Sequence, residues 1–432
     1  MLSLLDSSAE KTLHQYHVLG SNMNEELKPT IPYTSTADSD WLWASKDFSL
    51  VLGGPLFQLL RRSHLCGDAL ELLKQRILII SLLAWLPLLV LSALEGQALG
   101  GGAAVPFLMD VEVHVRFLLS LPLLIVAEIV VHQRMRFVVQ QFLERNLIPE
   151  NALRRFEVAI ASAFRLRNSI LAEVLLIAFV YVVSVPLIWR HYTALATATW
   201  YAAPAGAGLQ LLLAGKWYVY LSLPLFQFLL WRWYLRLFIW IRFLWHVSRI
   251  ELSLVPTHPD RVGGLGFLSN TVYAFMPLAV AHGALLAGLI ANRIFYLGAA
   301  LPEFKVEIAI VAVFLLCVVL GPLLLFSPQL AQAKRVGNRE YGALAARYVR
   351  EFDAKWVRGA APADEPLVGS GDIQSLADLA NSFEVVRTMQ IAPITRDALL
   401  RLVAATLVPI VPLLLTMMPL EELLKKLFGI LF

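Results

Sequence analysis

Four ionisable residues lie within otherwise apolar stretches of the sequence: Glu128, Glu173, Arg232 and Arg236. A charge inside a membrane is costly, so such residues are candidates for a functional site. At a rise of about 1.5 Å per residue, all four lie at a similar depth, in the inner third of the bilayer. Two acids and two arginines at one level can pair, so we predict a single cluster. Such a cluster either only orients helices or forms part of a gate or an ion path.

Basic residues continue beyond this level along the same predicted helix. At about 100° per residue, one sector of WRWYLRLFIWIRFLWHVSR contains Arg232, Arg236, Arg242, His246 and Arg249. A voltage sensor would need an arginine at every third position through the membrane centre, and that spacing is absent. The stripe either anchors the helix at an anionic inner leaflet or lines an aqueous vestibule that attracts anions.

A glycine-rich loop, VPTHPDRVGGLGFLSNT at 255–271, follows the basic stripe. Successive glycines let backbone N–H groups turn toward an anion, and the helix that follows adds its dipole. The loop lacks the Gly-Lys-Ser/Thr sequence of a phosphate-binding P-loop. It is either a tight turn between two membrane spans or an anion site, whose candidate residues are Arg261, Gly263, Gly264 and Gly266.

The same loop contains the only metal-ligand candidates in the pattern, His258 and Asp260. Two ligands without a third are weak support for a metal site, so we expect no metal and no other cofactor. Gly-x-Ser-x-Gly, His-Glu-x-x-His and paired intramembrane carboxylates are all missing. Enzymatic activity is therefore the less favoured class.

Composition defines the setting of these residues. Of the 432 residues, 58% are hydrophobic and 16% are charged, and the mean hydropathy is +0.67. An ordinary soluble domain is about 25% charged. The net charge of +4 is too small to indicate a nucleic-acid partner. We therefore predict an all-α polytopic bundle of transmembrane helices, with cytoplasmic helical segments and the lipid bilayer as its main partner.

Seven segments are long and apolar enough to cross about 30 Å of hydrocarbon. They are 77–94, 115–131, 169–189, 217–241, 271–291, 306–326 and 399–419. Alternate segments between them hold twenty-six and four Lys and Arg residues, which places the N-terminus in the cytoplasm. His282, near the middle of the fifth span, is expected to be a packed, hydrogen-bonded histidine.

The spans divide the chain into four regions. A cytoplasmic N-terminal segment, 1–76, contains an apolar stretch at 46–60 that is too short to span and is expected at the membrane interface. A six-span membrane domain covers 77–326, and a cytoplasmic helical region covers 327–398. There Tyr341, Leu344, Tyr348, Phe352 and Trp356 recur at helical spacing, a stripe suited to self-association. Residues 399–432 form the seventh span and an amphipathic tail.

The HPDRVGGLGF loop, the long helix after the sixth span and the ending VPLLLTMMPLEELLKKL resemble an uncharacterised family of bacterial polytopic inner-membrane proteins. The resemblance covers roughly residues 240–432. It implies a multi-pass protein of a bacterial inner membrane, and it carries no activity or site residue.

Three functions fit these patterns. The first is an oligomeric channel or passive transport protein for small ions, anions above all, in a homo-oligomer that binds a small anion or an anionic lipid. The second is a non-transporting membrane scaffold or complex subunit. The third is a membrane enzyme that acts on lipid head groups at the HPDRVGGLG loop. A continuous polar path between spans would favour the first function over the second.

Overall fold

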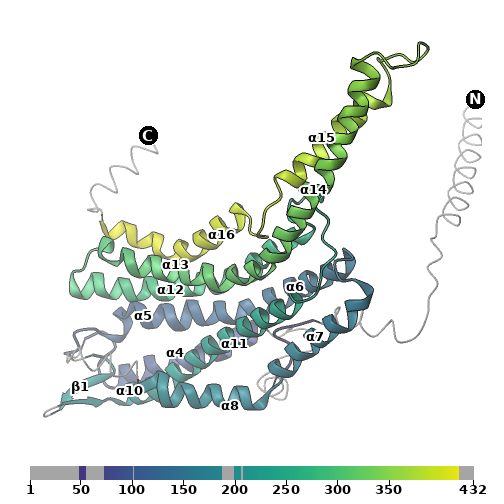
Figure 1. Cartoon of the computed structure of the whole chain (residues 1–432). Helices are drawn as coiled ribbons and strands as arrows, with labels where there is room; N and C mark the ends of the chain where they lie inside the picture. The colour runs from purple at the N-terminus through teal and green to yellow at the C-terminus, as the bar shows by residue number, and fades with distance from the viewer. Residues whose placement is uncertain (1–47, 55–72, 101, 187–198, 206–207, 418–432) are drawn as a thin grey trace, which may run out of the picture. The chain divides into compact units, whose positions relative to one another are not determined.

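The computed structural model describes residues 48–54, 73–100, 102–186, 199–205 and 208–417, all within one compact unit, Ala44–Phe432. Figure 1 shows these residues as a bundle of roughly aligned helices. The predicted amphipathic tail after residue 417 and most of the N-terminal segment 1–76 lie outside the described residues.

The first part of the bundle begins with α4 (Leu73–Leu94). After η1 (Phe107–Met109), one continuous helix is formed by α5 (Val111–His114), η2 (Val115–Ser120) and α6 (Leu121–Glu144). A short η3 (Glu150–Ala152) leads into α7 (Leu153–Arg167), α8 (Ile170–Phe179) and η4 (Val180–Ser184). A hairpin of β1 (Ala202–Ala205) and antiparallel β2 (Gly208–Leu211) follows.

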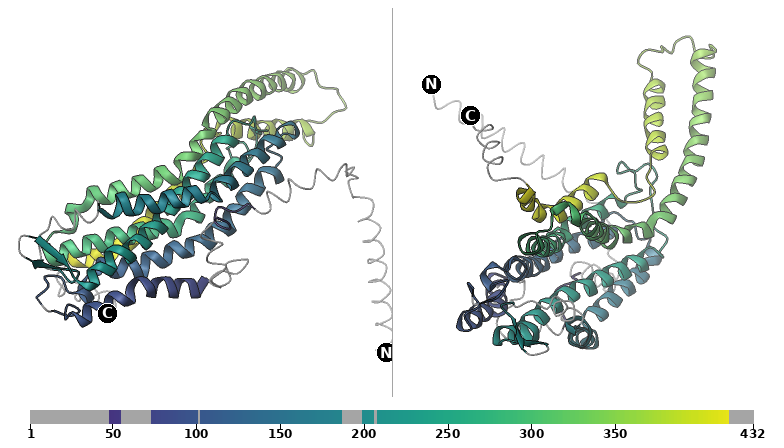
Figure 2. Two further views of the ribbon diagram at one scale, coloured as in Figure 1. Left: turned by 90° about the horizontal axis from the view of Figure 1, so that it is seen from below. Right: turned by 90° about the vertical axis from the view of Figure 1, so that its left-hand side faces the viewer.

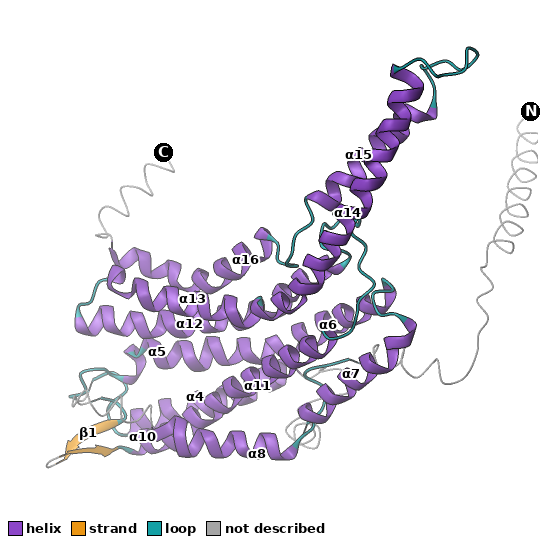
Figure 3. Cartoon of the chain, in the orientation of Figure 1, coloured by secondary structure: helices purple, strands orange, loops and turns teal. Residues whose placement is uncertain are grey.

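The second part starts with another continuous helix, made of α10 (Leu213–Trp217), η5 (Tyr218–Ser222) and α11 (Leu223–Val247). Then come η6 (Leu265–Asn270), α12 (Thr271–Leu297), η7 (Leu301–Phe304), α13 (Lys305–Val319) and η8 (Gly321–Phe326). The remaining helices are α14 (Ser327–Phe352), η9 (Asp353–Val357), α15 (Gly371–Arg387), α16 (Arg396–Leu407) and η10 (Val408–Met417). Figure 3 shows how completely helices dominate the described residues.

Prolines explain three π-helical turns in these continuous helices. The turn η2 precedes Pro122, η4 precedes Pro186 and η5 precedes Pro224. Proline has no N–H group to donate and its ring clashes with the carbonyl one turn earlier. A π-bulge widens the preceding turn and lets the helix continue. At Pro122 and Pro224, each within a Leu-Pro-Leu sequence, the helix therefore continues through the proline.

Among the described residues, four helices are long and apolar enough to cross a membrane: Leu73–Leu94, Val111–Glu144, Leu265–Leu297 and Arg396–Met417. Two pairs of helices, Glu150–Arg167 with Ile170–Ser184 and Leu301–Val319 with Gly321–Val357, are bent by 47° and 42°, and the number is six if each pair forms one span. These candidates coincide with six of the predicted spans. The fourth predicted span, 217–241, is not among them, because arginine, glutamine and proline make α11 less apolar.

The helix α12 lies at the centre of the second part and packs against α5, α6, α13 and α16. The helix α11 packs against α6, α7 and α8. The outward faces of α4, α8 and α13 carry exposed aliphatic side chains, among them Leu82, Leu175 and Ile310. Exposed apolar surface of this extent is typical of helices that contact lipid.

The helices α14 and α15 form an antiparallel hairpin that extends beyond the neighbouring helices (Figures 1 and 2). Part of the aromatic stripe predicted for self-association packs inside this hairpin. The Tyr348 hydroxyl donates to the Asp372 carbonyl at 3.0 Å, and the Trp356 indole donates to the Asp372 carboxylate at 2.9 Å. The stripe thus has an intramolecular partner in α15.

Gly283 on α12 allows close contact with α16. A Cβ atom at Gly283 would overlap the carbonyl oxygen of Thr406, a backbone atom that no rotamer change can move. We expect Gly283→Ala to lower the free energy of unfolding by about 3 kcal/mol, because overpacking forces the two helices apart. Thermal melting of the purified protein in detergent measures this. Gly371→Ala is the control, since a Cβ atom there meets open space. Equal melting temperatures for the two variants would contradict the close contact.

Candidate functional site

The four charged residues predicted to form one cluster lie in contact around Glu128. The Glu128 carboxylate accepts from Arg232 Nη1 at 3.3 Å and from Arg236 Nη2 at 2.7 Å. Arg232 Nε lies 3.4 Å from Glu173 Oε1. All four side chains are buried. The cluster connects α6, α8 and α11. The prediction of a single cluster, made from the similar depth of the four residues, is confirmed.

A fifth member, Arg76, was missed by the sequence reasoning. Its Nη2 donates to Glu128 Oε2 at 2.5 Å, and the residue is only 1% exposed. Arg76 lies one residue before the predicted first span, so it was counted among the cytoplasmic basic residues. In the structure α4 begins at Leu73, which brings Arg76 inside the bundle. The sequence does contain a signal for Arg76: it directly precedes an apolar segment, on the side of the membrane where the cluster was predicted.

The described cluster contains more positive than negative charge. Three arginines, Arg76, Arg232 and Arg236, face two glutamates, Glu128 and Glu173. The Nε and Nη1 atoms of Arg76 are buried and have no hydrogen-bond partner among the described residues. An unpaired donor of a charged group in a low-dielectric interior is unfavourable. The described cluster therefore carries one net positive charge and two arginine nitrogens without an acceptor.

The described part of the predicted interfacial stretch, residues 48–54, is buried beside this cluster. Phe48 packs against Phe164, Trp240 and Phe243, and Ser49 accepts a hydrogen bond from Arg167 Nη1 at its carbonyl oxygen. Gly54, at φ +87°, lies close to Glu173 and Arg232. A larger residue there would be strained and would crowd the Glu173 carboxylate. The described residues 48–54 thus pack against the helices of the bundle, and the position of the stretch 46–60 at the membrane interface stays a prediction.

The HPDRVGGLG loop is organised around Asp260. Its carboxylate accepts backbone hydrogen bonds from Val262 at 2.9 Å, Gly264 at 3.1 Å and Gly266 at 2.8 Å. His258 Nδ1 lies 2.8 Å from Asp260 Oδ1. The N–H groups of Gly264 and Gly266 are therefore occupied by a carboxylate of the same loop, and an outside anion would have to displace it.

The positive φ angles of the loop follow from this geometry. Gly263 and Gly264 have φ of +63° and +99°, and Arg261 has φ of +56°. These angles turn successive N–H groups toward Asp260, which favours glycine. No group of three His, Cys, Asp or Glu side chains suited to a metal occurs among the described residues. Asp260 with His258 acts as the organiser of a tight turn.

The basic stripe on the last turns of α11 points outward. Arg242 and Arg249 are exposed, and the Arg249 guanidinium lies 5.3 Å from the centre of the Trp245 ring. A stripe that lines a water-filled path would face inward, whereas a stripe that contacts lipid faces outward. The outward position of Arg242 and Arg249 does not match a stripe that lines an internal path.

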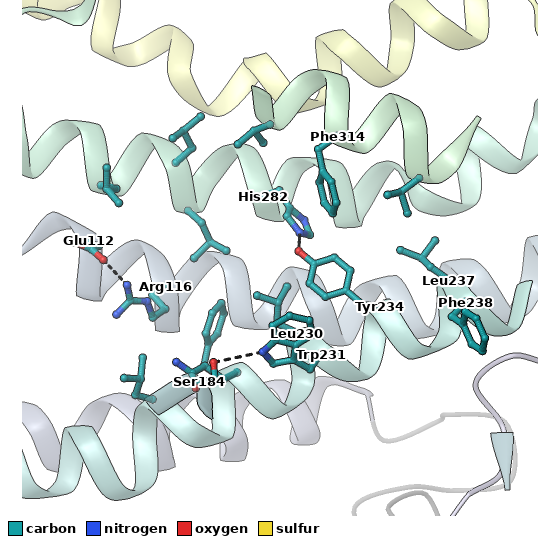
Figure 4. A pocket seen from close by; sticks show the side chains of 18 of the residues that line it. Glu112, Arg116, Ser184, Leu230, Trp231, Tyr234, Leu237, Phe238, His282 and Phe314 are labelled. Atoms are coloured by element: carbon teal, nitrogen blue, oxygen red, sulfur yellow. Dashed lines mark hydrogen bonds and ion pairs between the residues drawn. The ribbon is translucent and has the colours of Figure 1, made fainter. Parts of the chain in front are cut away.

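A cleft of about 750 Å³ lies between α11, α12 and α13 (Figure 4), and no residue of the arginine cluster lines it. Its lining is mostly apolar, with Glu112 and Arg116 paired at one end. Farther along, the Tyr234 hydroxyl and His282 Nε2 are 2.7 Å apart, and His282 Nδ1 donates to the Leu278 carbonyl at 2.7 Å. His282 is therefore packed and hydrogen-bonded on both nitrogens, as predicted.

Comparison with protein-family models, curated proteins and solved structures finds no match to this chain. The fold itself shows a mostly helical protein with four to six helices that could cross a membrane, and its apolar helices indicate a membrane protein. Its function has to be inferred from the geometry of the cluster, the loop and the cleft.

Removing Glu128 alone should destabilise the protein more than removing a matched pair. Glu128→Gln leaves three buried arginines without their shared carboxylate, and stranding a buried charge costs about 3–5 kcal/mol. We expect the double variant with Arg236→Gln to recover part of this loss, because one stranded charge is gone. Melting temperatures in detergent give the comparison. A double variant less stable than Glu128→Gln would contradict mutual compensation.

Acidification should open the HPDRVGGLG loop. Partial burial alone would raise the pKa of Asp260, but the backbone N–H groups of Val262, Gly266 and Gly264 hold it below its ordinary value of 3.8. A lowered pKa means that the carboxylate stabilises the loop above about pH 4. That contribution is lost as the pH falls through the pKa of the folded protein. Hydrogen exchange of the peptide covering 258–268, corrected for intrinsic rate, should accelerate over this range.

The matched variant for this experiment is Asp260→Asn. It should exchange faster than the wild type at neutral pH and show no further acceleration on acidification, because an amide has no proton to gain. Identical protection in the two proteins at neutral pH would show that Asp260 does not organise the loop.

Proposed function

We propose that the protein is a multi-pass protein of a bacterial inner membrane that lets small anions pass passively across the bilayer. Its location is supported by the six candidate spans, by the exposed aliphatic faces and by the resemblance of residues 240–432 to bacterial inner-membrane proteins. The twenty-six to four distribution of basic residues supports a cytoplasmic N-terminus.

The seven-span topology requires α11 to cross as well. Its two arginines that lie deepest, Arg232 and Arg236, are each paired with Glu128. Pairing lowers the cost of a charge inside a membrane, and paired charges face the bundle interior. The helix is 25 residues long, enough for a span. A buried, charge-paired crossing for α11 would complete the seven spans.

The observation that carries anion passage is Arg76. It shares one carboxylate with two further arginines and still has two buried nitrogens without a partner in the part of the chain that the structure describes. A small anion at Arg76 would supply the missing acceptor and balance the excess positive charge. In channels, charged side chains around the pore select ions by binding them weakly enough that each ion is released again. We propose that Arg76 binds an anion in this way. We propose two kinds of partner: anionic lipids at the exposed Arg242 and Arg249, and further copies of the same chain in a homo-oligomer.

Arg76→Gln should reduce anion flux about tenfold, the effect of roughly 1.4 kcal/mol of lost anion binding. Chloride efflux from proteoliposomes, with the membrane potential clamped, measures this. Arg339→Gln, an exposed position on α14, is the matched control and should leave efflux unchanged. Melting temperatures of both variants verify that they fold.

Two results would contradict the proposal. Unchanged efflux in a folded Arg76→Gln protein would show that Arg76 does not take part in transport. No efflux above empty liposomes for the wild type would favour the alternative, a non-transporting scaffold or complex subunit.

A further inference from the structure

The cleft between α11, α12 and α13 opens sideways onto the apolar exterior of the bundle. Two aromatic residues of its lining, Phe238 on α11 and Phe314 on α13, are 54% and 41% exposed. Next to Phe314, the exposed face of α13 continues through Val313 and Ile310. A molecule dissolved in the bilayer could therefore enter the cleft without passing through water.

One polar side chain that lines this cleft, Gln227, has no hydrogen-bond partner in the part of the chain that the structure describes. Gln227 is 3% exposed, and neither its Nε2 nor its Oε1 has a hydrogen-bond partner among the described residues. A buried polar group without a partner costs about 1–3 kcal/mol. The amide offers a donor and an acceptor side by side, which a ligand with a carbonyl or a hydroxyl group would satisfy.

The charged and aromatic polar groups of the cleft already have hydrogen-bond partners within the chain, so they leave no free charge to pair with a charged ligand. Arg116 pairs with Glu112 and donates to the Tyr218 hydroxyl. The Tyr234 hydroxyl donates to His282 Nε2, because His282 Nδ1 carries the proton that bonds the Leu278 carbonyl. Bringing a phosphate or a carboxylate into this site would bury a charge without a counterion. The site therefore favours a neutral ligand.

The depth of Gln227 and the aromatic lining of the cleft restrict the chemical class of the ligand further. Gln227 is ten residues past the start of the predicted span 217–241, about 15 Å along the helix and near the middle of the bilayer. A phospholipid keeps its head group at the surface, so it cannot present it there. Trp231, Tyr234 and Phe314 offer ring faces and edges on which a flat ring can pack (Figure 4).

We propose that the cleft binds a neutral, bilayer-soluble lipid whose head is a flat ring with carbonyl or hydroxyl groups, the chemistry of an isoprenoid quinone. One ring carbonyl accepts from Gln227 Nε2; in the reduced form, a ring hydroxyl donates to Gln227 Oε1. The ring packs among the aromatic side chains, and the tail leaves between Phe238 and Phe314. The proposal does not depend on anion passage, since no residue of the arginine cluster lines the cleft.

The test uses decylubiquinone and the full-length protein in detergent, with binding measured by equilibrium dialysis. The wild type should bind saturably. Gln227→Leu, similar in size but unable to hydrogen-bond, should bind at least tenfold more weakly. Leu285→Trp, which fills the cleft from α12, should not bind. Gln141→Leu changes another glutamine with an unpartnered side-chain oxygen, outside the cleft, and should bind like the wild type.

A second measurement separates a ligand role of Gln227 from a structural one. Without ligand, Gln227→Leu should melt at a higher temperature than the wild type, because it removes an unpartnered amide. A lower melting temperature would overturn the assignment. So would absence of saturable binding to the wild type, equal binding by Leu285→Trp, or preferential Gln227-dependent binding of oleate, a charged lipid of similar size.

Discussion

The carboxylate of Glu128 is the interaction on which the arrangement of this bundle depends. It receives arginines from two helices, Arg76 from α4 and Arg232 with Arg236 from α11, while Arg232 continues to Glu173 on α8. Apolar helices surrounded by lipid have little hydrophobic preference among partners, so buried polar contacts carry much of the specificity of their packing. A shared carboxylate fixes which helices meet and at what depth. It also links α11 to α6, because both arginines of α11 pair with Glu128.

Much of this arrangement could be predicted from the sequence, because the hydrophobic segments and the isolated charges are local signals. Segment lengths gave six of the candidate spans, and a rise per residue placed Glu128, Glu173, Arg232 and Arg236 at one level. Arg76 was not recognised because the boundary of a span is uncertain by about one turn. The burial of Phe48 beside Phe164 could not be predicted, since that contact joins segments more than a hundred residues apart.

The glycine loop shows why a motif alone is ambiguous. The pattern Gly-Gly-x-Gly indicates N–H groups that converge on an acceptor, and they do converge. The acceptor is Asp260, three residues before Gly263, so the loop supplies its own anion. Sequence spacing gives the donors but cannot say whether the acceptor is internal. The same carboxylate contacts His258. His258 and Asp260, the two candidate metal ligands of the sequence, therefore lie together in a tight turn.

Satisfied and unsatisfied polar groups divide this protein into two kinds of buried site. Asp260, Tyr234 and His282 have their hydrogen bonds met within the chain, so they stabilise structure. Within the described residues, two nitrogens of Arg76 and both amide atoms of Gln227 have no partner, although both side chains are almost fully buried. Native proteins leave few buried polar atoms unpaired, and each instance calls for a reason. The two residues differ in charge and in surroundings. The ligand that we propose for Arg76, beside other arginines, is therefore an anion, whereas the ligand that we propose for Gln227, a neutral amide in an apolar and laterally open cleft, is a neutral lipid.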